Sequence, residues 1–304
     1  MRVVFFGSGS FGLPTLTCLA AEHDVLGVVS QPDRPAGRHR VLRPTPIAAY
    51  AADHKLNLLR PDDVNAVASR EAIHAMEADA WVVIAYGQKL SRSLLGGRFA
   101  INLHASLLPR WRGAAPIHHA VLAGDCTTGV SVITLADRMD AGDVLGSDTL
   151  HIEPTDTTGS LHEHLADLGP AVIRGVLQQH EANTLAATSQ DESAVTLAPK
   201  IGRSMAKLEL SAGADTARNL INGCSPWPGV TVWVDGHRLR LLQAGDSPES
   251  SPLGYMSEAG LLGCESGAIQ ILSVQPEGGK PMSFGTWARG CRFDWPAQCL
   301  SEAP

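Results

Sequence analysis

The 304-residue sequence lacks any hydrophobic run long enough to cross a membrane. Its longest apolar run, from Trp81 to Tyr86, is only as long as a strand, whereas a membrane-spanning helix needs about 18 residues or more. A signal-peptide pattern is also missing, because Met1 and Arg2 are followed by four apolar residues and then a glycine-rich turn. We therefore expect a cytoplasmic protein with no membrane contact.

Positive charge is not in excess. Lys and Arg number 24 against 31 Asp and Glu, which gives a formal net charge of −7 at pH 7. A surface that is basic all over for binding nucleic acid is thereby excluded, but a local basic patch is not. With 44% hydrophobic and 18% charged residues, the composition is typical of a globular protein. The length favours two domains, at roughly 100–200 residues each.

Cysteine pairs of the CxxC type are absent, and no Cys/His set has zinc spacing. The adjacent His118 and His119, and the pair His162 and His164, would not share a helix face. We therefore predict no metal site. The six cysteines are scattered and are expected to be free thiols in a reducing compartment; they are Cys18, Cys126, Cys224, Cys264, Cys291 and Cys299.

Short apolar segments alternate with helix-like segments in the first half of the chain. We predict strands over residues 3–6, 25–29, 81–85, 100–103 and 130–135, and helices over residues 13–21, 44–54, 64–76, 114–123 and 161–179. This alternation indicates βαβ units, and hence an α/β fold with a mostly parallel sheet.

The pattern changes after about residue 185. Residues 188–204 are polar without clear periodicity, and a helix is predicted over residues 211–224 with Ser211 as its N-cap. Strand-like segments then flank Asp235-Gly236, a strong hairpin signal, and continue at residues 261–264 and 268–274. We predict a first domain over residues 1–185, a linker over 186–205 and a small β-barrel domain over 206–304.

A glycine-rich turn follows the first predicted strand. Residues 7–12, GSGSFG, match GxGxxG, and Asp33 follows Gly12 by 21 residues, as in dinucleotide-binding sites. However, Asp33 lies in a proline-containing loop and not at a strand end. We therefore favour a structural strand–turn–helix over a nucleotide site.

The most basic stretch of the chain is residues 33–43, DRPAGRHRVLR, which has only one acidic residue. A loop containing proline and glycine cannot bury four guanidinium groups, so they face water or a ligand. Arginine is the preferred phosphate ligand, and we therefore favour a local nucleic-acid contact over a merely solvated loop. The arginines concerned are Arg34, Arg38, Arg40 and Arg43.

Asn102 and His104 end a predicted strand at positions i and i+2, so both side chains point to the same side. Ligands of open α/β sheets bind at the carboxyl ends of strands. An asparagine can donate a hydrogen bond to a developing oxyanion, and a histidine beside it can move a proton. Asp140, which follows another predicted strand, could orient the imidazole. The absence of a nearby nucleophile suggests that the attacking group belongs to the substrate.

Residues 102–117, NLHASLLPRWRGAAPI, closely resemble the signature of the 10-formyltetrahydrofolate-dependent formyltransferases. The resemblance extends over nearly the whole chain, and it is greatest to the members that formylate the methionine of initiator tRNA for translation initiation. Other similar segments are residues 6–16 (FGSGSFGLPTL), 31–38 (QPDRPAGR), 83–87 (VIAYG), 128–130 (TGV), 140–143 (DAGD), 167–170 (DLGP), 226–229 (PWPG) and 279–290 (GKPMSFGTWARG).

The resemblance implies a Rossmann-like domain, with helices on both faces of its sheet, that binds folate instead of NAD. It also implies an OB-like barrel that helps to hold tRNA. The residues that match the family's catalytic ones are Asn102, His104 and Asp140. The implied folate-binding residues are Ala85, Tyr86, Gly87, Ser106, Leu107, Leu108, Pro109 and Asp140. The QPDRPAGR loop would reach the acceptor end of the tRNA, and Arg38 matches its important arginine.

The implied reaction is attack of the methionine α-amine on the formyl carbon of 10-formyltetrahydrofolate. Asn102 would stabilise the oxyanion, His104 would stabilise it and manage the amine proton, and Asp140 would hold His104. Whether His104 acts as a base or mainly as an electrostatic stabiliser stays open, as do the tRNA affinity and the acceptor-stem bases that are read.

Alternatives remain. Within the same chemistry they are formyl transfer to a small amine, such as a sugar nucleotide or glycinamide ribonucleotide, and hydrolysis of formyltetrahydrofolate. The intact QPDRPAGR and GKPMSFGTWARG segments argue against a small amine. The other classes are an NAD-dependent oxidoreductase and a non-catalytic RNA-binding protein. Residues 206–304 fit tRNA binding least, since they carry seven Lys and Arg against ten Asp and Glu. Where members usually have an Asp-Trp pair after the linker, residues 207–210 are KLEL. We expect a monomer.

Overall fold

The computed structural model describes residues 1–36 and 41–302. Its contacts divide the chain into two compact units. Unit 1 consists of Met1–Arg112, Gly129–Thr149 and Glu163–Thr196, and unit 2 of Gly113–Thr128, Leu150–His162 and Leu197–Pro304. The domain limits proposed from the sequence, at residues 185 and 205, stay a prediction.

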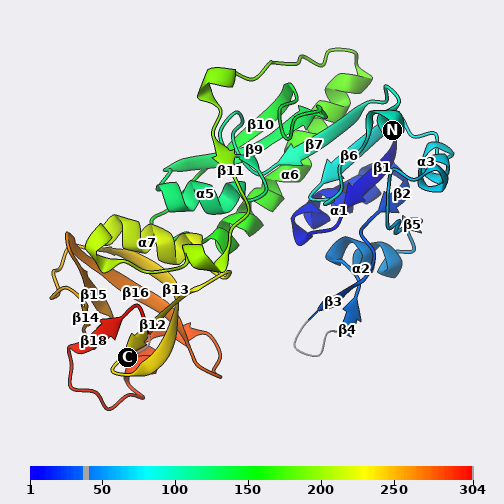
Figure 1. Ribbon diagram of the computed structural model, residues 1–304. Coiled ribbons are helices and arrows are strands. Elements are labelled where there is room, and N and C mark those ends of the chain that lie inside the picture. The colour runs from blue at the N-terminus through cyan, green and yellow to red at the C-terminus, as the bar shows by residue number, and fades with distance from the viewer. Residues whose placement is uncertain (37–40, 303–304) are drawn as a thin grey trace. The chain divides into compact units, whose positions relative to one another are not determined.

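Unit 1 is built on a seven-stranded sheet of order β10-β9-β7-β6-β1-β2-β5 (Figure 1). Its strands are β1 (Arg2–Gly7), β2 (Asp24–Val29), β5 (Leu58–Leu59), β6 (Ala80–Ile84), β7 (Ala100–His104), β9 (Thr127–Thr134) and β10 (Val144–His151). The neighbouring strands β5, β2, β1, β6 and β7 are parallel to one another, whereas β9 is antiparallel to β7. The mostly parallel α/β sheet predicted from the sequence is confirmed, but the edge strand β10 was not predicted.

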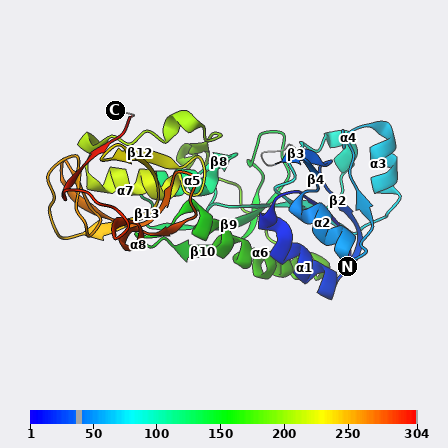
Figure 2. The same cartoon turned by 90° about the horizontal axis from the view of Figure 1, so that it is seen from below.

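Helices cover both faces of this sheet, also as predicted. They are α1 (Leu13–Glu22), α2 (Pro46–Asp53), α3 (Val67–His74), α4 (Arg92–Leu95) and α6 (Thr158–Glu181). Phe6 of β1 shares a core cluster with Ile73 of α3 and Leu94 of α4. Its neighbour Phe5 points the other way, towards Gly12 before α1. Figure 2 shows α6 alongside α1 on that other face.

The glycine-rich turn after β1 has a structural role. A Cβ atom at Gly7 would lie 2.5 Å from the ring of Phe5, so a larger residue does not fit. The Ser8 hydroxyl donates to the Tyr86 carbonyl oxygen at 2.9 Å and accepts from the Gln31 N–H at 3.2 Å. The turn therefore joins the ends of three strands, which supports the structural interpretation of the GxGxxG motif.

Unit 2 contains a closed antiparallel barrel. The strands β13, β12, β18, β14, β15 and β16 pair in this order, and β13 also pairs with β16, which closes the ring. Their bounds are β12 (Val230–Val234), β13 (His237–Ser247), β14 (Tyr255–Met256), β15 (Leu261–Cys264), β16 (Gly267–Pro276) and β18 (Ala297–Leu300). The hairpin predicted at Asp235-Gly236 is present, with both residues at positive φ as a two-residue turn requires. The small barrel is thus confirmed.

The predicted helix of unit 2 begins later than expected. Residues Leu210–Ala212 form a 3-10 turn, and α7 runs over Ala214–Gly223 with Gly213 at its N-cap. The expectation that Ser211 caps this helix is therefore wrong. The remaining elements of the chain are β3 (Arg34–Ala36), β4 (Val41–Arg43), β8 (Arg112–Gly113), α5 (Pro116–Ala123), β11 (Leu197–Ala198), β17 (Met282–Ser283), α8 (Phe284–Ala288) and four short 3-10 turns. Over the described ranges, no helix is long and apolar enough to span a bilayer.

Candidate active site

Asn102 and His104 lie at the carboxyl end of β7, a strand held on both sides by β6 and β9. Leu103, between them, points towards Gly169. A Cβ atom added at Gly169 would lie 2.7 Å from Cδ2 of Leu103. Asn102 and His104 therefore share the other face, on which Ala100 of the same strand joins the core cluster. This agrees with the prediction that the two side chains point the same way. His104 is buried and Asn102 half-buried.

The His104 imidazole lies between two acceptors. Its Nε2 atom is 2.9 Å from the Trp111 carbonyl oxygen, and a carbonyl only accepts, so Nε2 carries a proton and donates it. Its Nδ1 atom is 3.6 Å from Asp140 Oδ2, and only 7% of the His104 and 15% of the Asp140 side chain is exposed. The structure thus brings His104 and Asp140 together. The contact with Trp111 has no counterpart in the sequence prediction.

Asp140 reaches His104 only because its loop turns back. Since β9 is antiparallel to β7, with Thr134 opposite Ile101 and Ser131 opposite His104, β9 ends away from the carboxyl end of β7. The following loop must therefore reverse direction. Asp140 itself has φ of +52°, a left-handed conformation that costs a non-glycine residue about 1–3 kcal/mol. Contacts from elsewhere must stabilise this conformation.

The segment after His104 is fixed from inside. The Ser106 side chain is fully buried and its hydroxyl donates to the Arg110 carbonyl oxygen at 2.6 Å. The buried Ser131 hydroxyl donates to the Ser106 carbonyl oxygen at 2.8 Å and accepts from the Leu108 N–H at 3.1 Å. Leu107, Leu108 and Pro109 are half-buried. The Ser106 hydroxyl is thus engaged within the loop, and a cofactor contact by these four residues stays a prediction.

The segment after β6, residues 85–87, presents mainly backbone groups to a ligand, because its one large side chain, Tyr86, is buried. Tyr86 is 2% exposed, packs edge-on against Phe6, and has no hydrogen-bond partner for its hydroxyl in the described part of the chain. Burial raises the pKa of Tyr86 to about 12. Ala85 and Gly87 both have positive φ, of +46° and +90°. Folate contacts by these three residues also stay a prediction.

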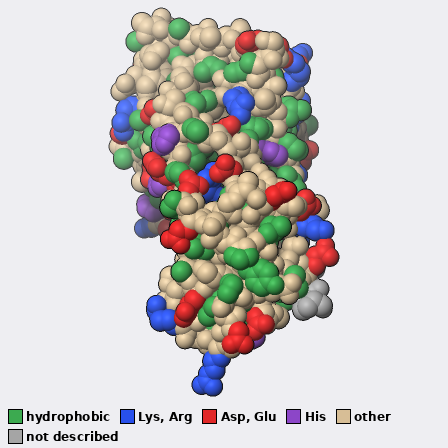
Figure 3. All heavy atoms as spheres, turned by 90° about the vertical axis from the view of Figure 1, so that its left-hand side faces the viewer, with side chains coloured by type: hydrophobic (Ala, Val, Ile, Leu, Met, Phe, Trp, Pro, Cys, Tyr) green, Lys and Arg blue, Asp and Glu red, His purple; other side chains and the backbone are tan. Residues whose placement is uncertain are grey.

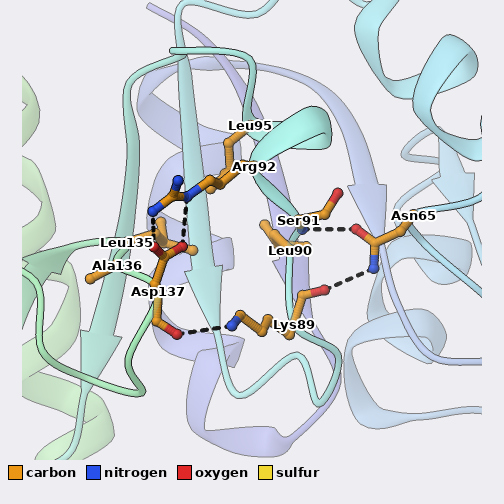
Figure 4. Close-up of a pocket in the computed structure, with 9 residues that line it drawn as sticks. All are labelled: Asn65, Lys89, Leu90, Ser91, Arg92, Leu95, Leu135, Ala136 and Asp137. Carbon is orange, nitrogen blue, oxygen red and sulfur yellow. Dashed lines mark hydrogen bonds and ion pairs between the residues drawn. The ribbon is translucent and has the colours of Figure 1, made fainter.

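A pocket of about 520 Å³ is lined mainly by residues of the segments that follow β6 and β9, and its volume is within the range of roughly 300–1,000 Å³ typical of small-molecule sites (Figure 4). Arg92 pairs through Nε with Asp137 Oδ1 at 2.8 Å, and Lys89 Nζ donates to the Asp137 carbonyl oxygen at 2.8 Å. The lining residues are Asn65, Lys89, Leu90, Ser91, Arg92, Leu95, Leu135, Ala136 and Asp137. None of these nine residues was predicted from the sequence, because no motif or periodicity distinguishes them.

The predicted basic loop is partly a hairpin. β3 and β4 pair antiparallel, with Arg34 opposite Arg43, and both side chains are exposed. Arg34 donates to Gln31 Oε1 at 3.0 Å. Asp33, which follows Gly12 by 21 residues as in dinucleotide-binding sites, pairs with Arg60 at 2.6 Å. The predicted tRNA ligands Arg38 and Arg40 lie outside the described residues. Within residues 1–36 and 41–302, no group of three His, Cys, Asp or Glu side chains could hold a metal ion.

Comparison with known proteins places these features in context. The family described as "Formyl transferase" matches residues 1–177, and "Formyl transferase, C-terminal domain" matches residues 200–292. A methionyl-tRNA formyltransferase of Jannaschia sp. is 40% identical over 296 residues, which cover 96% of this chain and 98% of that protein. One of Methylococcus capsulatus is 41% identical over 292 residues, which cover 93% and 94%.

Among solved structures, an N-formyltransferase of Helicobacter canadensis, in complex with folinic acid and dTDP-3-aminofucose, has a TM-score of 0.68 to this chain. The match covers 88% of this chain and 98% of that one, at 14% identity. At this identity the likeness concerns the fold alone.

Proposed function

Because this chain belongs to the formyl transferase family, we propose that it transfers the formyl group of 10-formyltetrahydrofolate to the α-amine of methionyl initiator tRNA, for translation initiation. The observation that carries this proposal is the sequence identity of 40% and 41% to two methionyl-tRNA formyltransferases over nearly their whole length. Both family domains are matched. The relatives named as methionyl-tRNA formyltransferases favour tRNA over a small amine as the acceptor.

The donor site that we propose is the 520 Å³ pocket lined by the segments that follow β6 and β9. Leu90, Leu95 and Leu135 provide apolar walls suited to a flat pteridine ring. The charged groups of the lining bind one another, since Arg92 pairs with Asp137 and Lys89 donates to the Asp137 carbonyl oxygen, so polar ends of the donor would have to compete with these contacts. The pocket and the centre are close along the chain, because Asp137 of the pocket precedes Asp140 by three residues. The donor contributes a formyl group on a nitrogen that can leave.

The catalytic roles that we propose follow from the geometry around His104. The Asn102 amide donates to the oxygen of the tetrahedral intermediate as negative charge develops there. Nε2 of His104 is committed to the Trp111 carbonyl, so His104 acts through Nδ1 and its ring charge. Asp140, 3.6 Å from Nδ1, stabilises the imidazolium that forms when the amine loses its proton.

The atoms balance in one acyl transfer. The bond between the amine nitrogen and the formyl carbon forms, and the bond from that carbon to the folate nitrogen breaks. One proton leaves the amine and one arrives at the folate nitrogen, so the products are formylmethionyl-tRNA and tetrahydrofolate. The reaction needs no oxidant, reductant or metal to balance.

The tRNA contact that we propose is the β3–β4 hairpin. Its exposed Arg34 and Arg43 can bind phosphates, and Val41 and Leu42 expose 55% and 64% of their surface. On the face seen in Figure 3, acidic and basic side chains are interspersed, with no single large basic patch. An Arg43→Ala variant should flatten the salt dependence of tRNA binding by about one unit if Arg43 meets one phosphate.

The proposal also covers compartment and assembly. All six cysteines are free thiols in the structure, which suits a reducing cytoplasm. We propose that the enzyme acts there as a monomer. Sedimentation of the purified protein with and without tRNA tests the assembly, and a stable dimer without tRNA would contradict it.

One experiment tests the function. The protein is incubated with 10-formyltetrahydrofolate and, in separate reactions, methionyl initiator tRNA, an amino-sugar nucleotide, or buffer alone. Formyl transfer is followed by mass spectrometry and tetrahydrofolate release by absorbance. Formylation of methionyl-tRNA well above the other two reactions is expected. Equal tetrahydrofolate release in buffer alone would instead indicate a hydrolase, and faster transfer to the sugar nucleotide would indicate a small-amine enzyme.

A further inference from the structure

Residues 188–196, here called the strap, leave α6 and lie against the loops of the catalytic centre within unit 1. Sequence analysis assigns them to a linker. We infer that the strap positions His104 and Asp140 for catalysis, an inference that rests on the proposed function of that site.

On the Asp140 side, the strap holds the reversed loop through Gln190. The Gln190 Nε2 group donates to the carbonyl oxygens of Asp140 at 2.8 Å and Gly142 at 2.7 Å. Its Oε1 atom accepts from Arg112 Nε at 2.9 Å. One side-chain amide thus uses two donors and one acceptor, and it fixes the backbone on both sides of the turn. These bonds offset the cost of the left-handed conformation of Asp140.

On the other side of the imidazole, the strap holds Trp111, whose carbonyl oxygen accepts a hydrogen bond from His104. The Thr196 hydroxyl accepts the Trp111 N–H at 2.9 Å, and the Thr196 carbonyl oxygen accepts the Arg112 N–H at 3.0 Å. Trp111 also has a left-handed φ of +62°, and its carbonyl receives the Nε2 proton of His104. Both acceptors that flank the imidazole are therefore fixed by the same nine-residue segment.

The strap is anchored along its length. Thr188 and Val144 exchange two backbone hydrogen bonds of 2.8 and 2.9 Å. The Arg112 side chain, only 6% exposed, also binds Glu192 at 2.9 Å, and Arg138 binds the other oxygen of Glu192 at 2.9 Å. Hydrogen bonding to Arg112 and then to Arg138 lowers the pKa of Glu192, so this anchor stays charged near neutral pH.

These contacts make Gln190 and Thr196 positioning residues, since neither touches a reacting atom. A displacement of about 1 Å at a reacting centre can cost on the order of 100-fold in rate. Each variant loosens only one of the two acceptors beside His104, the Trp111 carbonyl or the Asp140 carboxylate. The imidazole should therefore move by less than about 1 Å. We therefore expect each variant to lower kcat by about tenfold, with KM values for donor and acceptor unchanged within about twofold.

Two matched pairs of variants test the strap. Gln190→Ala removes the bridge to the Asp140 loop, and its control Ser193→Ala removes a hydroxyl whose bond to Asp191 stays inside the strap. Thr196→Val removes the hydroxyl that accepts the Trp111 N–H, whereas its control Thr196→Ser keeps a hydroxyl at this position. The first member of each pair should lower kcat, and each control should keep it within about twofold. Rates are normalised to the fraction of protein that binds tetrahydrofolate.

A double-mutant cycle separates positioning from general damage. In an Asp140→Ala background, Gln190→Ala should cause no further loss in the single-turnover rate, because the carboxylate that Gln190 positions is gone. Full tenfold loss in that background, or wild-type kcat for both Gln190→Ala and Thr196→Val, would overturn the inference. Inactivity of the wild-type protein towards methionyl-tRNA would instead refute the proposed function.

Discussion

Replacing Asp140 by asparagine should slow formyl transfer by about 100- to 1,000-fold without unfolding the protein. The two side chains have similar shapes, so the main change is the loss of one negative charge 3.6 Å from His104 Nδ1. At an effective dielectric constant of about 20, two unit charges at this separation attract by roughly 4–5 kcal/mol. Each 1.36 kcal/mol of transition-state stabilisation corresponds to about a tenfold change in rate. Water and local rearrangement recover part of that energy, which lowers the expected loss to about two to three powers of ten.

The assay is a single turnover with enzyme in excess over formyl donor and methionyl-tRNA, quenched and analysed by mass spectrometry. Tetrahydrofolate binding by calorimetry and thermal unfolding serve as controls for an intact fold. The loss should appear in the transfer rate and not in donor affinity, because the charge matters when the imidazolium forms. A transfer rate for Asp140→Asn within about threefold of wild type would refute the proposed pairing.

Three other predictions concern single positions. A Cβ at Gly142 would overlap the carbonyl oxygen of Thr134, so Gly142→Ala should displace the loop and lower kcat at least about tenfold; unchanged steady-state kinetics would contradict this. Cys126 is exposed, whereas burial raises the pKa of Cys299 to about 12. Iodoacetamide at about pH 8 should therefore label Cys126 in the native protein and Cys299 only after unfolding, as read by peptide mass spectrometry. Burial lowers the pKa of His118, so the unfolded chain binds more protons and stability rises with pH up to the ordinary value of about 6.5. His118→Gln should flatten the unfolding free energy measured in urea between about pH 5 and 6.5, and an unchanged slope would argue against it.

Much of the fold follows from local patterns. The buried strands β1 and β6 contain apolar runs, and the Asp235-Gly236 turn requires positive φ at both residues. Strand β10 was not predicted because its sequence VLGSDTLH has no apolar run, with the polar residues Ser147, Asp148 and Thr149 at its centre. The N-cap of α7 was misplaced because Ser211 has the right side chain, whereas the chain enters the helix two residues later through Gly213 at a φ of +90°.

In the candidate site, too, some features follow from local sequence patterns and others do not. A strand period of two residues predicts that Asn102 and His104 share a face, and the structure agrees. The Trp111 carbonyl beside His104 could not be predicted, because every residue has such a group and the sequence does not mark it. Gln190 lies 50 residues from its partner Asp140 in a polar segment without periodicity. The long-range hydrogen bonds that hold the Asp140 loop are therefore visible only in the folded chain.

The most direct test of the central claim is the single-turnover rate of formyl transfer to methionyl initiator tRNA by the wild-type protein and by Asn102→Ala and His104→Ala. We predict transfer by the wild type and losses on the order of 100- to 1,000-fold or more in each variant, with tetrahydrofolate binding and thermal stability retained. Wild-type transfer no faster than the uncatalysed reaction, or a folded variant as fast as the wild type, would contradict the account.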